Sequence, residues 1–133
     1  MNYKVGDVVC AKYGNFAGEQ VVGIFLIIYS EKQDRIYSDG HSNFNAVKIT
    51  TNNFLGDSYT VRLYPGDANL ETNSLVNISK IHTLSRDQVY KKIGTLKEDK
   101  MIKVFKELRN FNNEVESQIM EVIWVKKRKW KWQ

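Results

Sequence analysis

The stretch VVGIFLIIY, at residues 21–29, is the most strongly strand-forming segment of the chain. It is rich in β-branched and aromatic residues, and residues 24–28 form an unbroken apolar run. An unbroken run indicates a strand buried on both faces, because a half-exposed strand alternates apolar and polar residues. We therefore expect residues 21–29 to form a central strand of a sheet.

Four further segments predict strands, and glycine and proline mark the turns between them. The strand segments are residues 5–12, 45–51, 59–64 and 75–84, the last with imperfect alternation. Residues 13–18 form a glycine-punctuated loop, residues 38–41 carry an Asp-Gly hairpin signal, and residues 64–67 contain the only proline. Seven of the eight glycines lie at or before residue 66. We expect a compact, mostly antiparallel barrel from Gly6 to Leu84.

The last third of the chain predicts helices. Ser85 and Gln88 fit the Ser-x-x-Gln capping box, which would begin a short helix that ends at Gly94. A longer helix is expected from about Leu96, and its apolar residues follow at steps of three and four: Met101, Val104, Phe105, Leu108 and Phe111. The stripe can continue through Val115, Ile119, Val122 and Ile123. The pattern fits either one long helix or two.

Length and composition describe one ordinary globular domain. The chain has 133 residues, 42% of them apolar, which is enough to bury a core without disulfides. Cys10 is the only cysteine, so a disulfide framework and a cysteine-built zinc site are excluded. No apolar run approaches the roughly 20 residues of a membrane span, and none follows Lys4 to make a signal peptide. We expect a cytoplasmic protein without cofactor or metal.

Positive charge is concentrated at the C-terminus. The net charge is +5, and five of the twenty basic residues lie at 126–131, so that the other fifteen balance fifteen acidic residues. The tail interleaves cations with aromatics: Lys126, Lys127, Arg128, Lys129, Trp130, Lys131 and Trp132. Such a segment can bind nucleic acid, with its cations on phosphates and its aromatic rings stacked on bases, or it can pack as a structural element. Contact with an anionic membrane is the least favoured of the three interpretations.

Three stretches of the chain resemble the PemK/MazF family of bacterial toxins. VGDVV at residues 5–9 is similar to the family's opening Gly-Asp-Val/Ile strand. Gly18-Glu19-Gln20, followed by Leu26-Ile27-Ile28, resembles the segment Gly-Ser-Glu-Gln…Arg-Pro-x-Leu-Ile-Ile. Residues 74–84 and 92–101 are similar to the family's last strand, its Ile-Arg-Thr-Ile/Leu element and its C-terminal helix. The likeness spans roughly residues 5–110 and rests on the order and spacing of the motifs.

This resemblance implies both a fold and an activity. The fold is mainly β with C-terminal α: a small SH3-like barrel with helices over residues 1–113, followed by an extension at residues 114–133. The family is typically homodimeric, and each toxin is inhibited by a cognate antitoxin. Its members cleave single-stranded RNA without metal, through attack of the 2′-hydroxyl on the adjacent phosphate. An Arg of the Arg-Pro pair acts as an acid and stabilises charge, and a Thr or Ser after the third strand helps hold the phosphate.

The chain departs from the family at this arginine. The positions that match Arg-Pro are Gly23 and Ile24, and no basic residue lies between Lys12 and Lys32. The threonine is kept in Ile49-Thr50-Thr51, and His82 replaces the Arg of Ile-Arg-Thr. Loss of a charged donor to the transition state is costly. The sequence therefore predicts weak or absent cleavage unless another residue substitutes.

The candidate catalytic residues are Thr50, Thr51, His82 and Arg35. The threonines can donate to a phosphate, His82 titrates near neutrality, and Arg35 can reach back from the loop after the buried strand. The candidate RNA-binding residues are Glu19, Gln20, Lys32, Lys126, Lys127, Arg128, Lys129, Trp130 and Trp132. Each candidate also has a structural explanation. The threonines suit a strand by propensity, His82 can be a hydrogen-bonded structural residue, and the loop residues can simply be solvated. The resemblance thus supports an antitoxin-controlled endoribonuclease, and the missing arginine supports a non-catalytic RNA- or protein-binding module on the same barrel.

Overall fold

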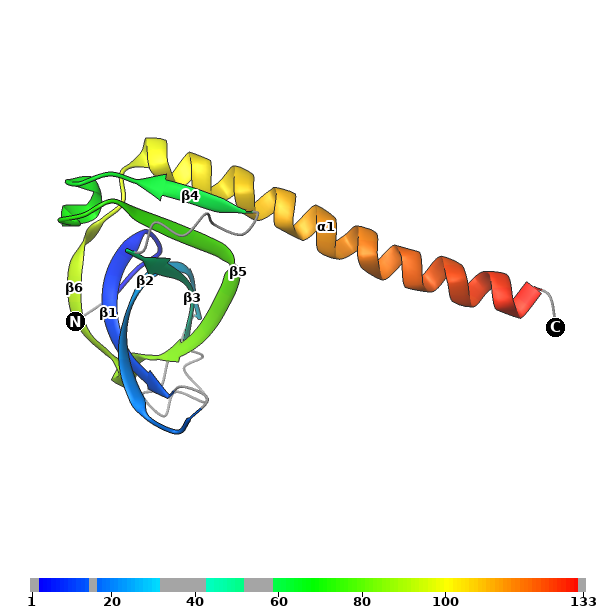
Figure 1. Cartoon of the computed structure of the whole chain (residues 1–133), viewed down its shortest axis with the longest axis horizontal. Helices are drawn as coiled ribbons and strands as arrows, with labels where there is room; N and C mark the ends of the chain where they lie inside the picture. The colour runs from blue at the N-terminus through cyan, green and yellow to red at the C-terminus, as the bar shows by residue number, and fades with distance from the viewer. Residues whose placement is uncertain (1–2, 15–16, 32–42, 52–58, 132–133) are drawn as a thin grey trace.

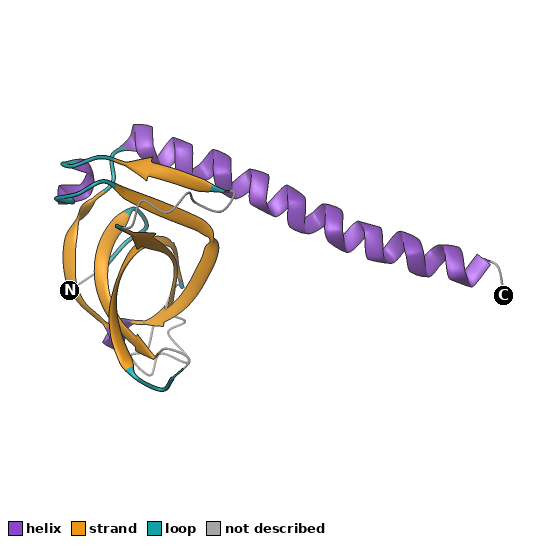
Figure 2. Cartoon of the chain, in the orientation of Figure 1, coloured by secondary structure: helices purple, strands orange, loops and turns teal. Residues whose placement is uncertain are grey.

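The computed structural model describes residues 3–14, 17–31, 43–51 and 59–131, with side chains up to residue 126. Within these ranges, the sheet is antiparallel throughout, in the strand order β4-β5-β3-β2-β1-β6. It curls round into a small barrel, and one C-terminal helix lies against it (Figures 1 and 2). The strands are β1 (Asp7–Gly14), β2 (Gln20–Ser30), β3 (Asn43–Thr50), β4 (Thr60–Leu63), β5 (Ser74–Ser85) and β6 (Val89–Thr95), and the helix is α1 (Glu98–Lys131). The expected fold of a mainly β barrel with C-terminal α is confirmed.

Strand β2 is central, as its apolar run predicts. It pairs with β1 on one side and with β3 on the other. Phe25, Leu26 and Ile27 are all fully buried, and they alternate between two apolar clusters. Leu26 packs in the cluster that α1 covers, which we call the helix-side core, whereas Phe25 and Ile27 face the other way. Burial on both faces explains why the run has no polar residue.

The imperfect alternation of β5 has a structural cause. Val47 of β3 pairs with Ile81 of β5, but the next residue, Lys48, pairs with Asn77. Residues 78–80 therefore have no partner in β3 and form an irregularity in the ladder. Beyond it, the alternation of buried and exposed side chains along β5 begins anew. No single period fits the strand because its two halves have different registers.

The predicted short helix between Ser85 and Gly94 is wrong. The capping contact exists, since the Ser85 N–H donates to Gln88 Oε1 at 2.8 Å, but it closes only a single 3₁₀ turn, Arg86–Gln88. The chain then forms β6, which pairs with β1 and buries Val89. The pairing offered by the open edge of β1 outweighs the local helix signal.

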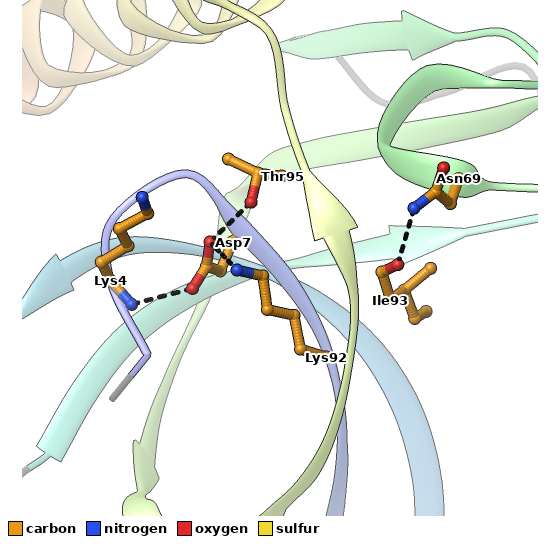
Figure 3. Close-up of polar contacts among 6 residues, drawn as sticks. All are labelled: Lys4, Asp7, Asn69, Lys92, Ile93 and Thr95. Atoms are coloured by element: carbon orange, nitrogen blue, oxygen red, sulfur yellow. Dashed lines mark hydrogen bonds and ion pairs between the residues drawn. The ribbon is translucent and has the colours of Figure 1, made fainter. Parts of the chain in front are cut away.

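Gly94 belongs to β6 and does not cap a helix. A Cβ at this position would lie 2.5 Å from the Ala68 carbonyl oxygen. Ala68 lies in the short turn Asp67–Asn69, which follows the predicted turn at residues 64–67 and is tied to β6 by a 3.1 Å bond from Asn69 Nδ2 to the Ile93 carbonyl (Figure 3). The glycine therefore permits a close backbone approach.

Asp7 joins the N-terminal segment to β6 (Figure 3). Its fully buried carboxylate accepts bonds from Thr95 Oγ1 at 2.9 Å and from the Lys4 backbone N–H at 3.0 Å. Lys92 Nζ lies 3.3 Å from the same carboxylate. Three donors account for the burial of this charge, so Asp7 has a structural role.

The C-terminal third contains one long helix of 34 residues, which begins at Glu98, close to the start expected near Leu96. Val104 is buried in the helix-side core, and Met101, Leu108 and Phe111 pack against it. Phe105, which the sequence places on the buried stripe, is 57% exposed. Beyond Phe111 the helix projects past the barrel with its apolar residues exposed (Figure 1). No helix in the described ranges is long and apolar enough to cross a membrane.

Candidate functional site

Strand pairing brings a group of polar and aromatic side chains together on the side of the sheet opposite the helix-side core. Phe25 of β2 pairs with Lys48 of β3, and Lys48 pairs in turn with Asn77 of β5. Because side chains alternate along a strand, Thr50 lies on the same side as Lys48, and Gly23 lies on the same side as Phe25. We call this group the Lys48 face: Tyr13, Gly23, Phe25, Lys48, Thr50, Asn77 and His82.

Three rings form the centre of the Lys48 face. The Tyr13 ring lies 5.4 Å from the Phe25 ring, centroid to centroid, and the His82 ring lies 5.2 Å from Phe25 and 5.7 Å from Tyr13. All three pairs meet edge to face, the arrangement that aromatic quadrupoles favour. Phe25 is buried, while Tyr13 and His82 are half-buried. The cluster therefore has an apolar floor and a polar, accessible rim.

Lys48 is fixed at this rim by a hydrogen bond. Its Nζ donates to Tyr13 Oη at 2.8 Å, and its side chain is half-buried. A lysine on an open surface has a mobile ammonium, whereas this one is held beside a ring cluster. The sheet thus carries a positioned cation on the face that contains Thr50.

Gly23 is required by the packing of these rings. A Cβ at this position would lie 2.8 Å from Tyr13 Cε1 and 2.9 Å from Phe25 Cε2, closer than side chains tolerate. The absence of a side chain allows both rings to close over β2. A long side chain at residue 23 would displace the ring that holds Lys48.

The surroundings of His82 favour its neutral form. Burial lowers the pKa of its imidazole below the usual value, and the positive charges of Lys48 and Lys80 lower it further. A neutral imidazole has one nitrogen that can accept a proton. His82 can therefore act as a general base as well as a hydrogen-bonding group.

Thr50 is oriented by a buried amide. Asn77 Nδ2 donates to Thr50 Oγ1 at 3.2 Å and to the Lys48 carbonyl at 3.3 Å. A hydroxyl that accepts one bond can still donate its own proton. Thr50 is half-buried and can offer that proton to a ligand oxygen on the Lys48 face.

Comparison with protein families identifies the barrel. Residues 4–111 match the family described as PemK-like, MazF-like toxin of type II toxin-antitoxin system. The chain belongs to this family. The matched region ends at Phe111, which is also the last residue of α1 that packs on the helix-side core. The predicted family membership is confirmed.

Solved MazF-like structures share the fold. One is an endoribonuclease in complex with its cognate antitoxin from a mycobacterial species, with 22% identity, a TM-score of 0.61, and coverage of 82% of this chain and 93% of that one. MazE-MazF from Deinococcus radiodurans gives 15% identity and a TM-score of 0.61, covering 84% of this chain and 96% of that one. The Mycobacterium tuberculosis toxin MazF-mt6 gives 16% identity and a TM-score of 0.57, covering 78% of this chain and 93% of that one. No curated protein sequence matches the chain. These likenesses establish the fold alone.

The structure separates the two threonines that the MazF-like motif presents as a pair. Thr50 lies on the Lys48 face, but exposed Thr51 lines a groove of about 440 Å³ with Cys10, Ile24 and Lys91. Cys10 and Ile24 pair with each other on β1 and β2, and by alternation they lie on the opposite side from Gly23 and Phe25. Thr50 and His82 are therefore brought to one face, and Thr51 is not.

The other predicted site residues lie away from this face or outside the described ranges. Glu19 and Gln20 are exposed at the β1–β2 hairpin, where Gln20 pairs with Gly14. Lys126 is exposed near the end of α1. Lys127, Arg128, Lys129 and Trp130 lie in α1, where only the backbone is described. Lys32, Arg35, Trp132 and the predicted hairpin at residues 38–41 fall outside the described residues.

Sequence reasoning missed Lys48, Tyr13 and Asn77. A signal existed for Lys48, because the order Lys48-Ile49-Thr50 in a strand puts the lysine and Thr50 on one side. Tyr13 and Asn77 could be found only from the register of β1 and of the irregular β5. In the described parts of the chain, no three His, Cys, Asp or Glu side chains are grouped to hold a metal ion.

Proposed function

We propose that this MazF-like chain is a toxin-type endoribonuclease that cleaves single-stranded RNA in the cytoplasm and is controlled by an antitoxin. The observation that carries the proposal is the Lys48 face, where Thr50 and His82 lie together on the family's barrel. Cleavage by a neighbouring 2′-hydroxyl needs a base and donors around the phosphate, and needs no protein nucleophile. Both kinds of group are present on this face.

The chemistry assigned to the face is transesterification. The His82 imidazole takes the proton of the 2′-hydroxyl, whose oxygen then attacks phosphorus. The bond from phosphorus to the 5′-oxygen breaks, and that oxygen takes a proton from water. The products are a 2′,3′-cyclic phosphate and a 5′-hydroxyl. Thr50 donates to a non-bridging oxygen while negative charge develops there.

Cleavage of a long single-stranded RNA tests this proposal. The full chain is incubated with the RNA in the presence and absence of EDTA, and the products are examined for 2′,3′-cyclic phosphate ends. We expect cleavage that persists in EDTA, and its loss on chelation would overturn the metal-free route. Binding without cleavage would instead support the non-catalytic RNA-binding module, the alternative that Gly23 favours.

The proposal includes two further partners. A second copy of the chain forms a homodimer, and an antitoxin covers the RNA-binding surface, in keeping with the family. Light scattering after size exclusion tests the dimer, because a monomer has the 15.5 kDa of the chain. An acidic protein encoded by the adjacent reading frame, expressed together with the chain, tests the antitoxin by suppression of cleavage.

The basic tail is proposed as an accessory RNA-binding element. Lys126 is exposed on a part of α1 that projects beyond the barrel, and four more cations follow it in the sequence. Cations that neutralise phosphates release counterions, and aromatic rings stack on bases. The tail would then increase affinity while the Lys48 face performs the chemistry.

A further inference from the structure

We propose that Lys48 supplies the phosphate-binding cation of the site and takes the place of the arginine that this chain lacks at Gly23. The inference rests on the proposed RNA cleavage and assigns a catalytic role to a residue that the family motif does not mark. Its basis is the position of one ammonium group relative to Gly23, Tyr13 and Thr50.

Lys48 lies beside the position of the lost arginine. Phe25 of β2 pairs with Lys48 of β3, and Ile24 pairs with Ile49. Gly23 and Thr50 come next along the two strands, so Lys48 lies diagonally across from residue 23. Its ammonium reaches the Tyr13 ring that covers Gly23. Lys48 on β3 can therefore reach the ligand that an arginine at position 23 of β2 would bind.

Gly23 and the placement of Lys48 depend on each other. The space above Gly23 is filled by the Tyr13 and Phe25 rings, which leave no room for a side chain on β2. The same Tyr13 accepts the 2.8 Å bond from Lys48 Nζ. Gly23 therefore makes room for the Tyr13 ring, which positions Lys48. The same glycine that removes the family's arginine thus allows Lys48 to be held nearby.

The groups of the Lys48 face divide the work of the proposed reaction. Lys48 binds a non-bridging oxygen of the phosphate and offsets the negative charge that grows as the 2′-oxygen bonds to phosphorus. Thr50 donates to the second oxygen, and His82 holds the proton taken from the 2′-hydroxyl. Lys48 acts through its charge and takes no part in proton transfer. Its positive charge also disfavours protonation of His82, which keeps that base ready.

Kinetics of three variants test the proposal on the full chain. Lys48→Met keeps the aliphatic stem and removes the charge, Lys48→Arg restores a cation, and Lys80→Met removes the second lysine charge that acts on His82. We expect Lys48→Met to lower kcat about 10²- to 10³-fold with KM changed only a few-fold. Lys48→Arg should recover most of the rate, and Lys80→Met should stay within about threefold of the wild type. Thermal melting checks that each variant folds.

Two results would overturn the role of Lys48: full activity of Lys48→Met, or equal losses for Lys48→Met and Lys80→Met. If the wild type fails to cleave RNA, the proposed function fails, and binding of a 2′-deoxy-substituted, non-cleavable RNA decides the inference separately. Lys48→Met should then still weaken binding and reduce the salt slope by about 0.7, whereas wild-type affinity and slope would reject a phosphate interaction at Lys48.

Discussion

Neighbouring residues of β3 serve opposite sides of the sheet and different purposes. Val47 and Ile49 are buried in the helix-side core, which α1 covers, whereas Lys48 and Thr50 belong to the Lys48 face and are half-buried. At these positions one side is apolar and covered by α1, whereas the other carries a cation, a hydroxyl and an imidazole beside a second buried apolar cluster. Since the strand period is two, stability and chemistry can be changed independently by substitutions one residue apart.

Substitution of Ile49 should give the largest change in stability. Ile49→Ala leaves a cavity in the helix-side core and should lower the free energy of unfolding by about 2–5 kcal/mol. Lys48→Met removes one half-buried hydrogen bond and should cost about 1 kcal/mol or less. Urea unfolding of both variants measures the difference. If Lys48→Met is more destabilising than Ile49→Ala, the assignment of Lys48 to chemistry and of Ile49 to stability is wrong.

Substitution of Gly23 should give the next largest change. Gly23→Ala forces the Tyr13 and Phe25 rings apart and should lower the free energy of unfolding by about 1–3 kcal/mol. It should also slow RNA cleavage, because Tyr13 positions Lys48. Gly14→Ala is the matched control in β1, where a Cβ meets no atom within 4 Å. Wild-type stability and activity of Gly23→Ala would show that the ring cluster is not tightly fitted.

The pH dependence of stability and of cleavage should include a contribution from His82 on the Lys48 face. Burial first, then Lys48 and Lys80, lower the pKa of His82, so the neutral form is favoured in the folded chain. Protonation therefore opposes folding, and the contribution of His82 to stability is lost as the pH falls below 6.5, the ordinary imidazole value. Cleavage should fall over the same range as the base is protonated.

Lys48→Met should raise the pKa of His82, because a positive neighbour is removed. NMR titration of the imidazole protons of His82 measures the pKa, and His41→Gln simplifies the assignment because the chain has only two histidines. A pKa that stays unchanged in Lys48→Met would place the ammonium away from the imidazole.

Removal of the tail should have the smallest effect on stability. A chain that ends at Val125 loses only residues beyond the part of α1 that packs on the barrel, so its free energy of unfolding should stay within about 0.5 kcal/mol. Its RNA affinity should fall, and the salt slope should decrease by about 0.7 for each phosphate that the tail had neutralised. Equal affinity and slope for both chains would exclude the tail as an RNA element. A failure of the shortened chain to fold or dimerise would show that its tryptophans are structural.

The sequence predicted the parts of the fold that local patterns determine. The apolar run at residues 24–28 identified the central strand, and the stripe through Val104 and Phe111 identified the packed part of α1. The prediction for residues 89–95 was wrong, because the capping signal at Ser85 is strong locally while the partner of β6 lies some eighty residues away in β1. Phe105 was misplaced because the buried stripe is narrower than its apolar residues suggest.

The candidate site was less accessible to sequence reasoning. Thr50 and His82 were named from the motif, and the structure brings them to one face. Their neighbours include residues of two further strands, β1 and β2, so the Lys48 bond to Tyr13 and the need for Gly23 follow only from register and ring packing. The loss of the arginine was visible in the sequence, and so was a lysine on the side of Thr50, but the nearness of Lys48 to Gly23 depends on the register of β2 and β3.

Occupation of the Lys48 face by RNA can be tested directly by NMR. Backbone amide shifts are followed while a non-cleavable 2′-O-methyl RNA is added to the isotopically labelled full chain. We expect the largest shifts at Lys48, Thr50 and His82, with a second set in the tail and only small shifts at Val104 and Leu108 in the packed part of α1. Shifts confined to the tail, with Lys48, Thr50 and His82 unmoved at saturation, would show that RNA does not bind this face.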